Sequence, residues 1–557
     1  MFKRILIANR GEIAVRVIRT AREMGIATVA VYSDADRGAL HVMLADEAQR
    51  IGPPPPAQSY LNIEVLIDAA RRMRADAVHP GYGFLAENAA FARAVASAGL
   101  TWIGPHPDAI EAMGDKLRAR DAMQRAGVPV VPGGLEPVAD LAAAKDAAAR
   151  YGLPLALKAA AGGGGKGLKV AQSLDELQSA FDTARREAEA YFKDPTLYAE
   201  RYLENPKHVE LQILADKHGG VVHVGERDCS LQRRHQKLWE ETPATIPETA
   251  RTALRDAGIR AAQAIGYDSA GTIECLVDGD RFYFLEMNTR IQVEHTVSEM
   301  VSGLDLIREQ IRIAAGEPIG YAQEAVRFAG HAIEARINAE DPEKNFLPAP
   351  GAIAAYREPG GPGVRVDSAA FSGWAIPPEY DSLIAKLIVW APDRAQAVAR
   401  MRRALDEYFI AGVPTTRQFL RDLCDRPQVE DATYGTATLE QFARTWRPST
   451  ANAAQRDGAV VAASHASKRL APRLTTLRAR RSSGDGDHVV APMHGIIVDL
   501  RAAGGESVTE GEVVAIIEAM KMMNEIRAHR SGRVAEVYVR AGSPVESGSP
   551  LLRLAEN

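Results

Sequence analysis

The last 70 residues of the chain contain an internal repeat, and this repeat constrains the possible fold more than any other feature. When the sequence is laid over itself with an offset of 37 residues, five positions of the first half coincide with the same residue in the second half without a gap. Each half has short apolar runs separated by Gly, Ser and Glu, a pattern typical of strands and turns. We therefore predict a small pseudo-symmetric β-sandwich over residues 488–557. The coinciding pairs are Ala491 and Ala528, Gly495 and Gly532, Gly505 and Gly542, Val508 and Val545, and Gly511 and Gly548.

The junction between the two halves carries the sequence EAMKMM, residues 518–523. A lysine flanked by methionines on a turn between two strands is presented to solvent rather than packed. Alone, the tetrapeptide AMKM is equally compatible with an ordinary helix or turn. Its position between the halves of a β repeat favours a functional role for Lys521.

The N-terminal region alternates strand and helix patterns. Residues 5–8 and 28–32 are predicted to be buried strands, and residues 11–24 carry apolar side chains at helical spacing. Further strands are predicted at 77–79 and 101–103. Strands that alternate with helices indicate a parallel sheet, so we predict a doubly wound α/β unit over residues 1–115.

Composition excludes several classes of protein. A chain of 557 residues predicts several folding units. Lys plus Arg is 67 and Asp plus Glu is 72, so no global positive field attracts nucleic acid or an anionic membrane. The first apolar run has four residues, too short for a signal peptide, and no window approaches 18 apolar residues. We expect a cytoplasmic protein without nucleic-acid or membrane partners.

The segment 447–487 separates the repeat from the rest of the chain. It is rich in Ala, Ser and Arg and holds eight Lys or Arg against three Asp or Glu. We predict a flexible linker here, since such a composition cannot bury much apolar surface.

A run of four glycines, Gly162–Gly165, follows Lys158 and precedes Lys166. Consecutive glycines let several backbone N–H groups approach an anion, and the two lysines add positive charge. The run predicts a phosphate cradle, although a mobile loop without a ligand is as compatible with this stretch alone. It is not a Walker A loop, because Gly167 is followed by Leu168.

Residues 271–294 are predicted to form a hairpin around Asp278-Gly279-Asp280. A three-residue loop would make Glu274 and Glu286 diagonal neighbours on one face, roughly 7 to 8 Å apart. A loop of two or four residues would put them on opposite faces. Two carboxylates on one face near a phosphate cradle predict a Mg²⁺–nucleotide site.

Polar residues continue at every second position from Glu286 to Glu294. An extended segment would place all of them on one side, although a solvated edge strand has the same pattern. Arg290 and Glu294 on such a face could hold a small anion and accept its proton. The segment 226–237 is also dense in hydrogen-bond donors, and a surface basic patch is its plainer interpretation.

Together these motifs resemble a known family. Residues 488–557 resemble the biotinyl carrier domain of biotin-dependent carboxylases, whose lysine in the AMKM motif carries biotin; lipoyl carriers share the fold but usually lack the two methionines. Residues 1 to about 446 resemble biotin carboxylase, an ATP-grasp enzyme. The matching stretches are IANRGEIA (7–14), HPGYGFL (79–85), GDK (114–116), YLENPKHVE (202–210), QRRHQK (232–237) and EMNTRIQVEH (286–295).

This resemblance implies a mixed α/β chain with a doubly wound N-terminal domain (1–115), a lid that closes over ATP (130–204), a C-terminal carboxylase domain (205–446) and an all-β carrier. It also implies roles for individual residues. ATP contacts fall on Lys116, Lys158, Gly163, Gly164, Glu200, Leu203, His208, Gln232, His235 and Lys237; Mg²⁺ or Mn²⁺ ligands on Glu274, Glu286 and Asn288; the bicarbonate pocket on Arg290, Gln292 and Val293; the base on Glu294; the group that stabilises the biotin enolate on Arg336; and covalent biotin on Lys521.

The reaction implied by the resemblance begins with attack of bicarbonate on the γ-phosphate of ATP. The carboxyphosphate formed breaks down to CO₂ and phosphate, the phosphate deprotonates biotin, and carboxybiotin is the product. Residues 240–247 are shorter than and altered from the family's corresponding stretch, which leaves the shape of that loop open.

Neither a carboxyltransferase domain nor the docking domain common in related α-subunits is found in the sequence. We therefore expect an α-subunit of an acyl-CoA carboxylase that works with a biotin protein ligase and with a separate carboxyltransferase subunit. The carboxylase part is expected to form a homo-oligomer inside a hetero-oligomer. Two alternatives remain: another ATP-grasp ligase, against which the carrier repeat argues, and a nonenzymatic carrier, against which the intact site residues argue.

Overall fold

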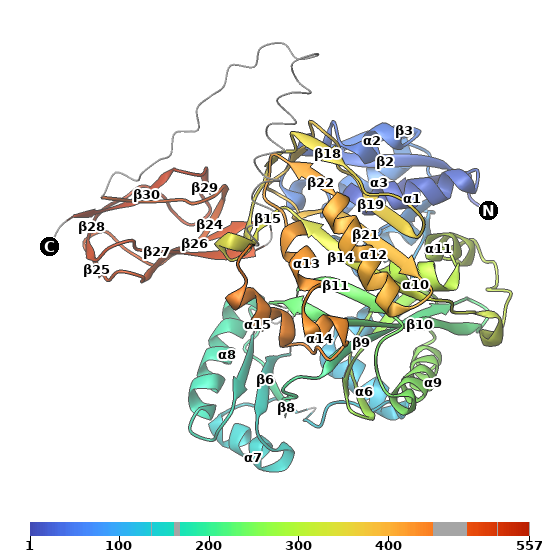
Figure 1. Ribbon diagram of the computed structural model, residues 1–557, viewed down its shortest axis with the longest axis horizontal. Helices are drawn as coiled ribbons and strands as arrows, with labels where there is room; N and C mark the ends of the chain where they lie inside the picture. Colours follow the sequence, from blue (N-terminus) through green and yellow to red (C-terminus); the bar gives the residue numbers. More distant parts are fainter. Residues whose placement is uncertain (135, 161–166, 235, 449–486, 521, 556–557) are drawn as a thin grey trace, which may run out of the picture.

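The computed structural model describes residues 1–448 and 487–555, apart from residues 135, 161–166, 235 and 521. The chain forms a parallel sheet unit, a small lid, a large antiparallel sheet unit and a separate β-sandwich, in that order (Figure 1). Among the described residues, no helix has the length and apolar character that crossing a bilayer requires.

The N-terminal unit is a five-stranded parallel sheet with the order β3-β2-β1-β4-β5, which confirms the predicted doubly wound class. Its central strand carries Ile5, Leu6 and Ile7, all fully buried because helices cover both faces. The elements are β1 (Arg4–Ile7), α1 (Gly11–Glu23), β2 (Ala27–Ser33), α2 (Leu40–Leu44), β3 (Glu47–Gly52), α3 (Ile63–Arg72), β4 (Ala77–His79), α4 (Ala89–Ser97), β5 (Thr101–Trp102) and α5 (Pro107–Gly114).

The lid is a three-stranded antiparallel sheet, in the order β7-β6-β8, with two helices packed on one face. Leu155 and Leu157 belong to the buried lid core with Phe181, so the alternation of strand β6 directs Lys158 to the opposite face. The linking helix and the lid elements are α6 (Lys116–Arg125), α7 (Leu141–Tyr151), β6 (Leu155–Ala159), β7 (Leu168–Ala171), α8 (Leu177–Phe192) and β8 (Leu197–Arg201).

The large unit is built on an eight-stranded antiparallel sheet with the order β13-β12-β9-β10-β11-β14-β21-β19. Helices α6 and α9 bury one part of the sheet, and helices α12 and α13 bury the other. The main elements are β9 (Lys207–Ala215), β10 (Val221–Arg233), β11 (Gln236–Thr242), α9 (Glu248–Ala264), β12 (Ser269–Asp278), β13 (Arg281–Asn288), α10 (His295–Ser302), α11 (Leu306–Ala314), β14 (His331–Asn338), β19 (Val364–Ser368), β21 (Leu383–Ala391), α12 (Arg394–Glu407), α13 (Arg417–Leu423), α14 (Pro427–Glu430) and α15 (Thr438–Thr445).

Short strand pairs complete the large unit beside its sheet, antiparallel in every case. They are β15 (Glu340–Asp341) with β16 (Leu347–Pro348), β17 (Gly351–Ala352) with β20 (Ala375–Ile376), and β18 (Ala355–Arg357) with β22 (Phe409–Ala411).

The C-terminal sandwich follows the predicted repeat. Strands β24 and β28, β25 and β29, and β26 and β30 start 37 residues apart. Each half lends its short strand to the sheet built by the other half, which gives the orders β23-β30-β28-β25 and β27-β26-β24-β29. The pseudo-symmetric β-sandwich is therefore confirmed. The strands are β23 (His488–Val490), β24 (Gly495–Leu500), β25 (Ser507–Val508), β26 (Val513–Ala519), β27 (Met522–Arg527), β28 (Gly532–Val537), β29 (Pro544–Val545) and β30 (Pro550–Ala555).

Candidate active site

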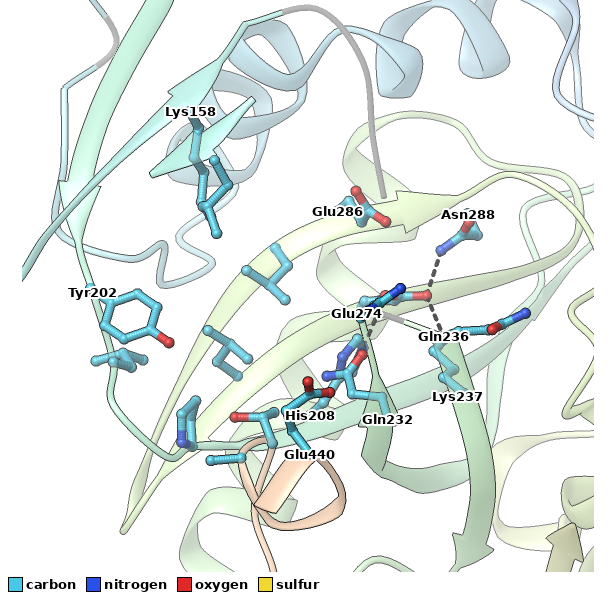
Figure 2. Close-up of a pocket in the computed structure, with 18 of the residues that line it drawn as sticks. Lys158, Tyr202, His208, Gln232, Gln236, Lys237, Glu274, Glu286, Asn288 and Glu440 are labelled. Atoms are coloured by element: carbon cyan, nitrogen blue, oxygen red, sulfur yellow. Dashed lines mark hydrogen bonds and ion pairs between the residues drawn. The ribbon is translucent and has the colours of Figure 1, made fainter. Parts of the chain in front are cut away.

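A cavity of about 810 Å³ lies between the lid and the large antiparallel sheet (Figure 2). It brings together residues that are up to 286 positions apart, from Lys158 on the lid to Arg444 on α15. The predicted site residues that line it are Lys158, Glu200, Leu203, His208, Gln232, Lys237, Glu274, Glu286, Asn288, Arg290, Gln292, Val293, Glu294 and Arg336.

Five predicted residues cannot be placed in this cavity. Gly163, Gly164, His235 and Lys521 lie outside the described residues, as does the rest of the predicted phosphate cradle apart from Lys158. Lys116 is the first residue of α6, but its side chain is not described.

The hairpin that carries Glu274 and Glu286 differs from the prediction in its turn. Asp278 pairs with Arg281, so the turn contains two residues rather than three. In a regular ladder, a two-residue turn would place the two glutamates on opposite faces, and the predicted diagonal pairing of a three-residue turn is therefore wrong.

A β-bulge restores the shared face. Cys275 pairs with Phe284, but the next pair along the ladder is Glu274 with Glu286, which leaves Leu285 as the extra residue on its strand. The two carboxylate side chains are thus direct cross-strand neighbours rather than diagonal ones. The same bulge explains how consecutive residues, Leu285 and Glu286, both line the cavity.

The ammonium group of Lys237 lies among three carboxylates. Its Nζ is 2.8 Å from Oε1 of Glu294 and 3.1 Å from Oε1 of Glu274, and it also pairs with Glu210. Burial alone would lower the pKa of Lys237, but these three carboxylates raise it well above its ordinary value. Lys237 is therefore a fixed positive charge at the centre of the site.

Glu294 is held as an anion between two cations. Its Oε1 accepts from Lys237 and its Oε2 accepts from Arg336 Nη2 at 3.0 Å. Burial raises the pKa of Glu294, yet Lys237 and Arg336 outweigh this effect and keep the pKa well below its usual range. Arg336 also donates from Nε to Oε1 of Glu240 at 2.6 Å, so its guanidinium is fixed in orientation.

The polar run after the hairpin is not one extended strand. Strand β13 ends at Asn288, and the following residues are irregular up to the start of α10. Arg290, Gln292 and Glu294 nevertheless all line the cavity. Val293 lines it as well, although strict alternation would have placed it on the other side.

The side chains of this run are fixed by neighbours from other elements. Arg290 donates from Nε to Oε2 of Glu87 in the N-terminal unit at 2.8 Å. Gln292 donates to Oε1 of Glu274 at 2.7 Å and accepts from Nη2 of Arg227 at 2.6 Å. The irregular segment is therefore held by both domains that border it.

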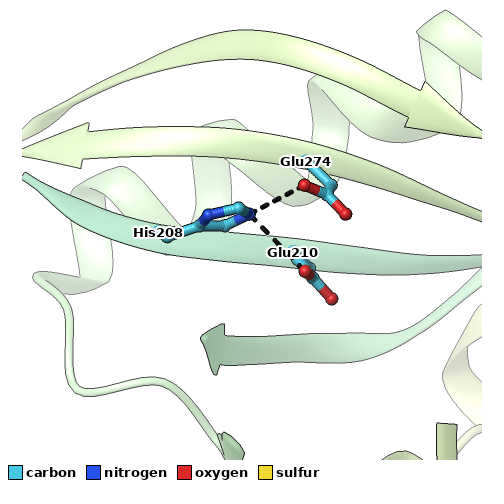
Figure 3. A group of neighbouring side chains, drawn as sticks. All are labelled: His208, Glu210 and Glu274. Atoms are coloured by element: carbon cyan, nitrogen blue, oxygen red, sulfur yellow. Dashed lines mark ion pairs between the residues drawn. The ribbon is translucent and has the colours of Figure 1, made fainter. Parts of the chain in front are cut away.

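His208 and two glutamates form a compact buried group (Figure 3). Nε2 of His208 is 2.9 Å from Oε2 of Glu274 and 3.5 Å from Oε1 of Glu210. Burial alone would lower the pKa of His208, but the Glu274 carboxylate reverses the shift and raises it. An ion pair with a lysine usually lowers the pKa of a glutamate. For Glu210 the effect of burial is larger than that of Lys237, and its pKa is raised to about 7.

The donor set around Glu274 fits a hard divalent cation. Glu274 and Glu286 supply carboxylate oxygens from adjacent strands, and Asn288 supplies an amide whose Nδ2 now donates to Oε1 of Glu274 at 2.7 Å. All three face the cavity, as Mg²⁺ bound to a nucleotide requires.

The lid side of the cavity places a cation opposite this group. Lys158 forms an ion pair with Glu200, which also accepts from Arg120 Nη1 at 3.1 Å. Tyr198 is the cross-strand partner of Lys158 and lines the cavity with it. Leu276 and Leu285 add an apolar wall, against which the ring of a nucleotide base could pack.

Sequence reasoning missed several residues of the site. Glu210 and Gln212 follow His208 at period two along β9, while Val209 and Leu211 fill the core, so alternation alone would have found them. Arg227 belongs to the donor-rich segment 226–237, and its complete burial shows that the interpretation of this segment as a surface basic patch is wrong at this residue. It is fully buried and bonds Glu210, Gln212 and Gln292, a role that only the assembled sheet reveals.

Lys386 was also missed. It is fully buried on β21, directly opposite Arg336 on β14 and Asp367 on β19. Its Nζ donates to the backbone oxygen of Val293 at 2.8 Å and lies 3.3 Å from Oε1 of Glu12. Lys386 thus anchors the peptide that precedes Glu294.

A lid over a cavity of carboxylates and lysines, next to a large antiparallel sheet, defines an ATP-grasp ligase, here with a carrier sandwich in the same chain. Comparison with known families makes the assignment specific. The matching models are described as "Biotin carboxylase, N-terminal domain" (residues 1–110), "Carbamoyl-phosphate synthase L chain, ATP binding domain" (115–321), "Biotin carboxylase C-terminal domain" (334–441) and "Biotin-requiring enzyme" (487–554).

Similarity to individual proteins supports the same family. The chain is 53% identical over 443 residues to "Biotin carboxylase" of Nostoc sp., covering 79% of this chain and 99% of that one. It is 52% identical over 421 residues to a pyruvate carboxylase subunit of Methanothermobacter thermautotrophicus, covering 75% and 86%. The biotin carboxylase domain dimer of Hydrogenobacter thermophilus 2-oxoglutarate carboxylase, solved with MgADP, ADP and bicarbonate, matches with a TM-score of 0.77 and 50% identity over 80% and 99%. The chain belongs to the biotin carboxylase family and is fused to a biotin carrier domain.

Proposed function

We propose that this chain is the α-subunit of an acyl-CoA carboxylase. It carboxylates biotin on Lys521 at the expense of ATP and passes the carboxyl group to a separate carboxyltransferase subunit. The single observation that carries the proposal is the bracket of Lys237 and Arg336 around the Glu294 carboxylate, in one chain with a biotin-requiring domain. A biotin protein ligase would modify Lys521.

In this proposal, Glu294 takes the proton of bicarbonate. Its lowered pKa keeps it ionised, and Arg290, Gln292 and Val293 border the space in which the anion would lie. The deprotonated oxygen of bicarbonate then attacks the γ-phosphorus of ATP, the bond to the β-phosphate oxygen breaks, and ADP leaves. Lys237 is placed to balance the charge that develops in this step.

Glu274, Glu286 and Asn288 are the proposed ligands of Mg²⁺ or Mn²⁺. When bound, the ion would neutralise charge on the β- and γ-phosphates. Lys158 and His208 would contact the phosphates of ATP. Glu200 and Leu203 would contact its adenine ring. The further proposed ATP contacts are Lys116, Gly163, Gly164, Gln232 and His235.

Arg336 is the proposed stabiliser of negative charge on the biotin ureido oxygen. Its guanidinium is fixed by Glu240 and Glu294 and borders the cavity, so little reorganisation is needed when that charge appears. The carboxylase part would act as a homo-oligomer, as the dimer described for the Hydrogenobacter relative suggests.

A second candidate acceptor is a 2-oxo acid. Two of the relatives are named for pyruvate and 2-oxoglutarate carboxylation, and both are about as similar to this chain as the biotin carboxylase is. The acceptor would bind on the carboxyltransferase subunit in either case.

The acceptor is tested by coexpressing the chain with a biotin ligase and co-purifying it with its carboxyltransferase subunit. Intact mass first establishes one biotin on the chain, absent in Lys521→Arg. Fixation of labelled bicarbonate is then compared for acetyl-CoA, propionyl-CoA, pyruvate and 2-oxoglutarate. Fixation with a CoA ester supports the proposal, and fixation only with a 2-oxo acid replaces it with the second candidate.

A further inference from the structure

The carrier sandwich lies against the large carboxylase unit (Figure 1). Among the described residues, the contact includes two apolar side chains, one from each domain. Met520 follows the last residue of β26 in a left-handed conformation, with φ of 51°, and is only 4% exposed. Its side chain belongs to the apolar cluster of the large carboxylase unit, not to the core of its own domain. In the other direction, Leu347 of the carboxylase packs against the carrier core.

A backbone hydrogen bond accompanies this exchange of side chains. The N–H of Met520 donates to the carbonyl oxygen of Pro378 at 3.3 Å. The carboxylase side of the contact therefore includes Leu347, on the β15–β16 hairpin, and Pro378, in the loop before β21. We call these two residues and the cluster that receives Met520 the carrier seat.

The two segments of the carrier seat are bonded to each other. Glu340 is buried at the base of the hairpin and accepts from Oγ of Ser382 at 2.6 Å and from Nδ2 of Asn338 at 3.1 Å. The backbone N–H of Ala339 also donates to the carbonyl oxygen of Ser382 at 2.7 Å. The hairpin and the loop thus form one rigid surface.

This surface is also fixed to the active site. Strand β14 carries Arg336 and runs directly into the hairpin that carries Leu347. At the tip of the hairpin, Arg233 donates to the carbonyl oxygen of Asn345 at 3.0 Å and lies over the ring of Phe346. The two neighbours of Arg233 that line the cavity are Gln232 and Arg234.

We propose that the carrier seat is the position from which the carrier domain presents its modified lysine to the carboxylase cavity. The inference rests on the proposed function, since it assumes biotin on Lys521. Met520 directly precedes that lysine in the sequence, so docking of Met520 constrains where the biotin arm starts. A linker raises the effective concentration of the carrier near the cavity but does not orient it. Docking on the carrier seat would orient the carrier.

In the part of the chain that the structure describes, the contact between the carrier and the carboxylase is small, which suits a domain that must also leave. Inter-domain contacts of limited extent permit relative motion, and a flexible methionine side chain adapts to an apolar pocket without a demanding fit. The carrier can therefore dock for carboxylation and depart for the transfer step.

The test uses Leu347→Asp in the full chain, coexpressed with a biotin ligase. Leu347 is on the carboxylase, so the substitution leaves the lysine and its flanking sequence intact. Leu347→Met is the conservative variant, and Leu61→Asp, at an exposed leucine of the N-terminal unit, is the matched control. Three quantities are measured: biotin by intact mass, ATP turnover dependent on free biotin, and the single-turnover rate at which labelled bicarbonate enters the tethered biotin.

The carrier seat predicts that Leu347→Asp lowers the single-turnover rate at least tenfold, with the biotin content and the free-biotin rate unchanged. Leu347→Met and Leu61→Asp should behave as the parent chain. An unchanged or faster tethered rate overturns the proposal, because the contact would then be incidental or a resting position. An equal loss of both rates also overturns it, since Leu347 would act on the cavity itself. Absence of biotin from the parent chain would instead contradict the proposed function.

Discussion

At the scale of single residues, the site is organised around fixed opposite charges. Lys237 faces Glu210, Glu274 and Glu294, while Arg336 faces Glu294 from the other side. Removing one member of such a buried group leaves an uncompensated charge, so the ionisation states are determined jointly. This arrangement keeps Glu294 ionised although it is almost fully buried.

Glu294→Gln should remove the proposed general base with little change in the shape of the side chain. Bicarbonate-dependent ATP turnover with free biotin should fall by about 10² to 10⁴-fold, the usual contribution of a general base. Glu440→Gln is the matched control, because Glu440 is another carboxylate of the cavity lining but comes from α15 rather than from the segment that carries Glu294. Loss of less than tenfold in steady-state assays would contradict the assigned role.

Lys386→Met should destabilise the protein because Glu12 and Asp367 would lose their buried cation. We expect a loss of roughly 3 to 5 kcal/mol in the free energy of unfolding. The double variant Lys386→Met with Glu12→Gln removes charges of both signs and should recover at least half of that loss. Denaturant unfolding measures both, and a double variant no more stable than the single one would contradict this pairing.

At the scale of elements, the sequence predicted those features that follow from periodicity. Four of the five strands and the first helix of the N-terminal unit were found within a residue or two, since buried parallel strands produce continuous apolar runs. Strand β3 (Glu47–Gly52) was missed, because its sequence EAQRIG is mostly polar and only its end is buried. In the carrier domain, the short apolar runs of the repeat located the strands in the same way.

The β12–β13 hairpin shows what periodicity could not supply. Its two-residue turn and its bulge at Leu285 offset each other, so the predicted shared face of Glu274 and Glu286 arose from a different register. The bulge depends on the assembled sheet, and no residue type in the sequence indicates it. Buried partners such as Arg227 and Lys386 were missed for the same reason, because their contacts come from distant strands.

The dependence of ATP turnover on Mg²⁺ should change when the carboxylates of the β12–β13 hairpin are altered. Glu286→Gln should raise the Mg²⁺ concentration needed for half-maximal ATP turnover at least tenfold, because one of the two proposed carboxylate ligands loses its charge. Asp278→Asn, at the turn of the same hairpin and away from the cavity lining, should leave it unchanged. Titration of chelator-treated protein with Mg²⁺ measures this, and equal curves for the parent chain and Glu286→Gln would refute the metal assignment.

The stability of the N-terminal unit should depend on pH because of His79, the last residue of β4. Burial lowers the pKa of His79 to about 3 in the folded state, against about 6.5 in the unfolded chain. The unfolded chain therefore binds a proton that the folded protein does not, and stability is lost as the pH falls from 6.5 towards 3.

His79→Asn should reduce this loss. The slope of the unfolding free energy against pH should become shallower by up to ~1.4 kcal/mol per pH unit between pH 6 and 4. Asparagine offers an acceptor in place of Nδ1, which accepts from the N–H of Gly81 at 3.0 Å. Denaturant unfolding over this range checks the change, and an unaltered slope would exclude His79 as a source of acid sensitivity.

At the scale of the whole molecule, one chain combines an ATP-dependent carboxylase with the carrier that its product occupies. The cavity is bordered by the lid on one side, and the Glu87–Arg290 ion pair joins its lining to the N-terminal unit. The carrier lies against the large unit at the end of the strand that carries Arg336. In this layout the carrier domain and the carboxylase cavity belong to the same polypeptide and border the same unit.

The most direct test of the account follows the oxygen atoms of bicarbonate. If bicarbonate attacks the γ-phosphorus of ATP, one of its oxygens must remain in the phosphate that is released. Turnover of the full chain with ¹⁸O-labelled bicarbonate, ATP, Mg²⁺ and free biotin should therefore yield inorganic phosphate carrying one ¹⁸O, detected by mass spectrometry, and Glu294→Gln should release little phosphate. Phosphate whose new oxygen comes only from water would show that ATP is simply hydrolysed, and would contradict the assignment of the cavity.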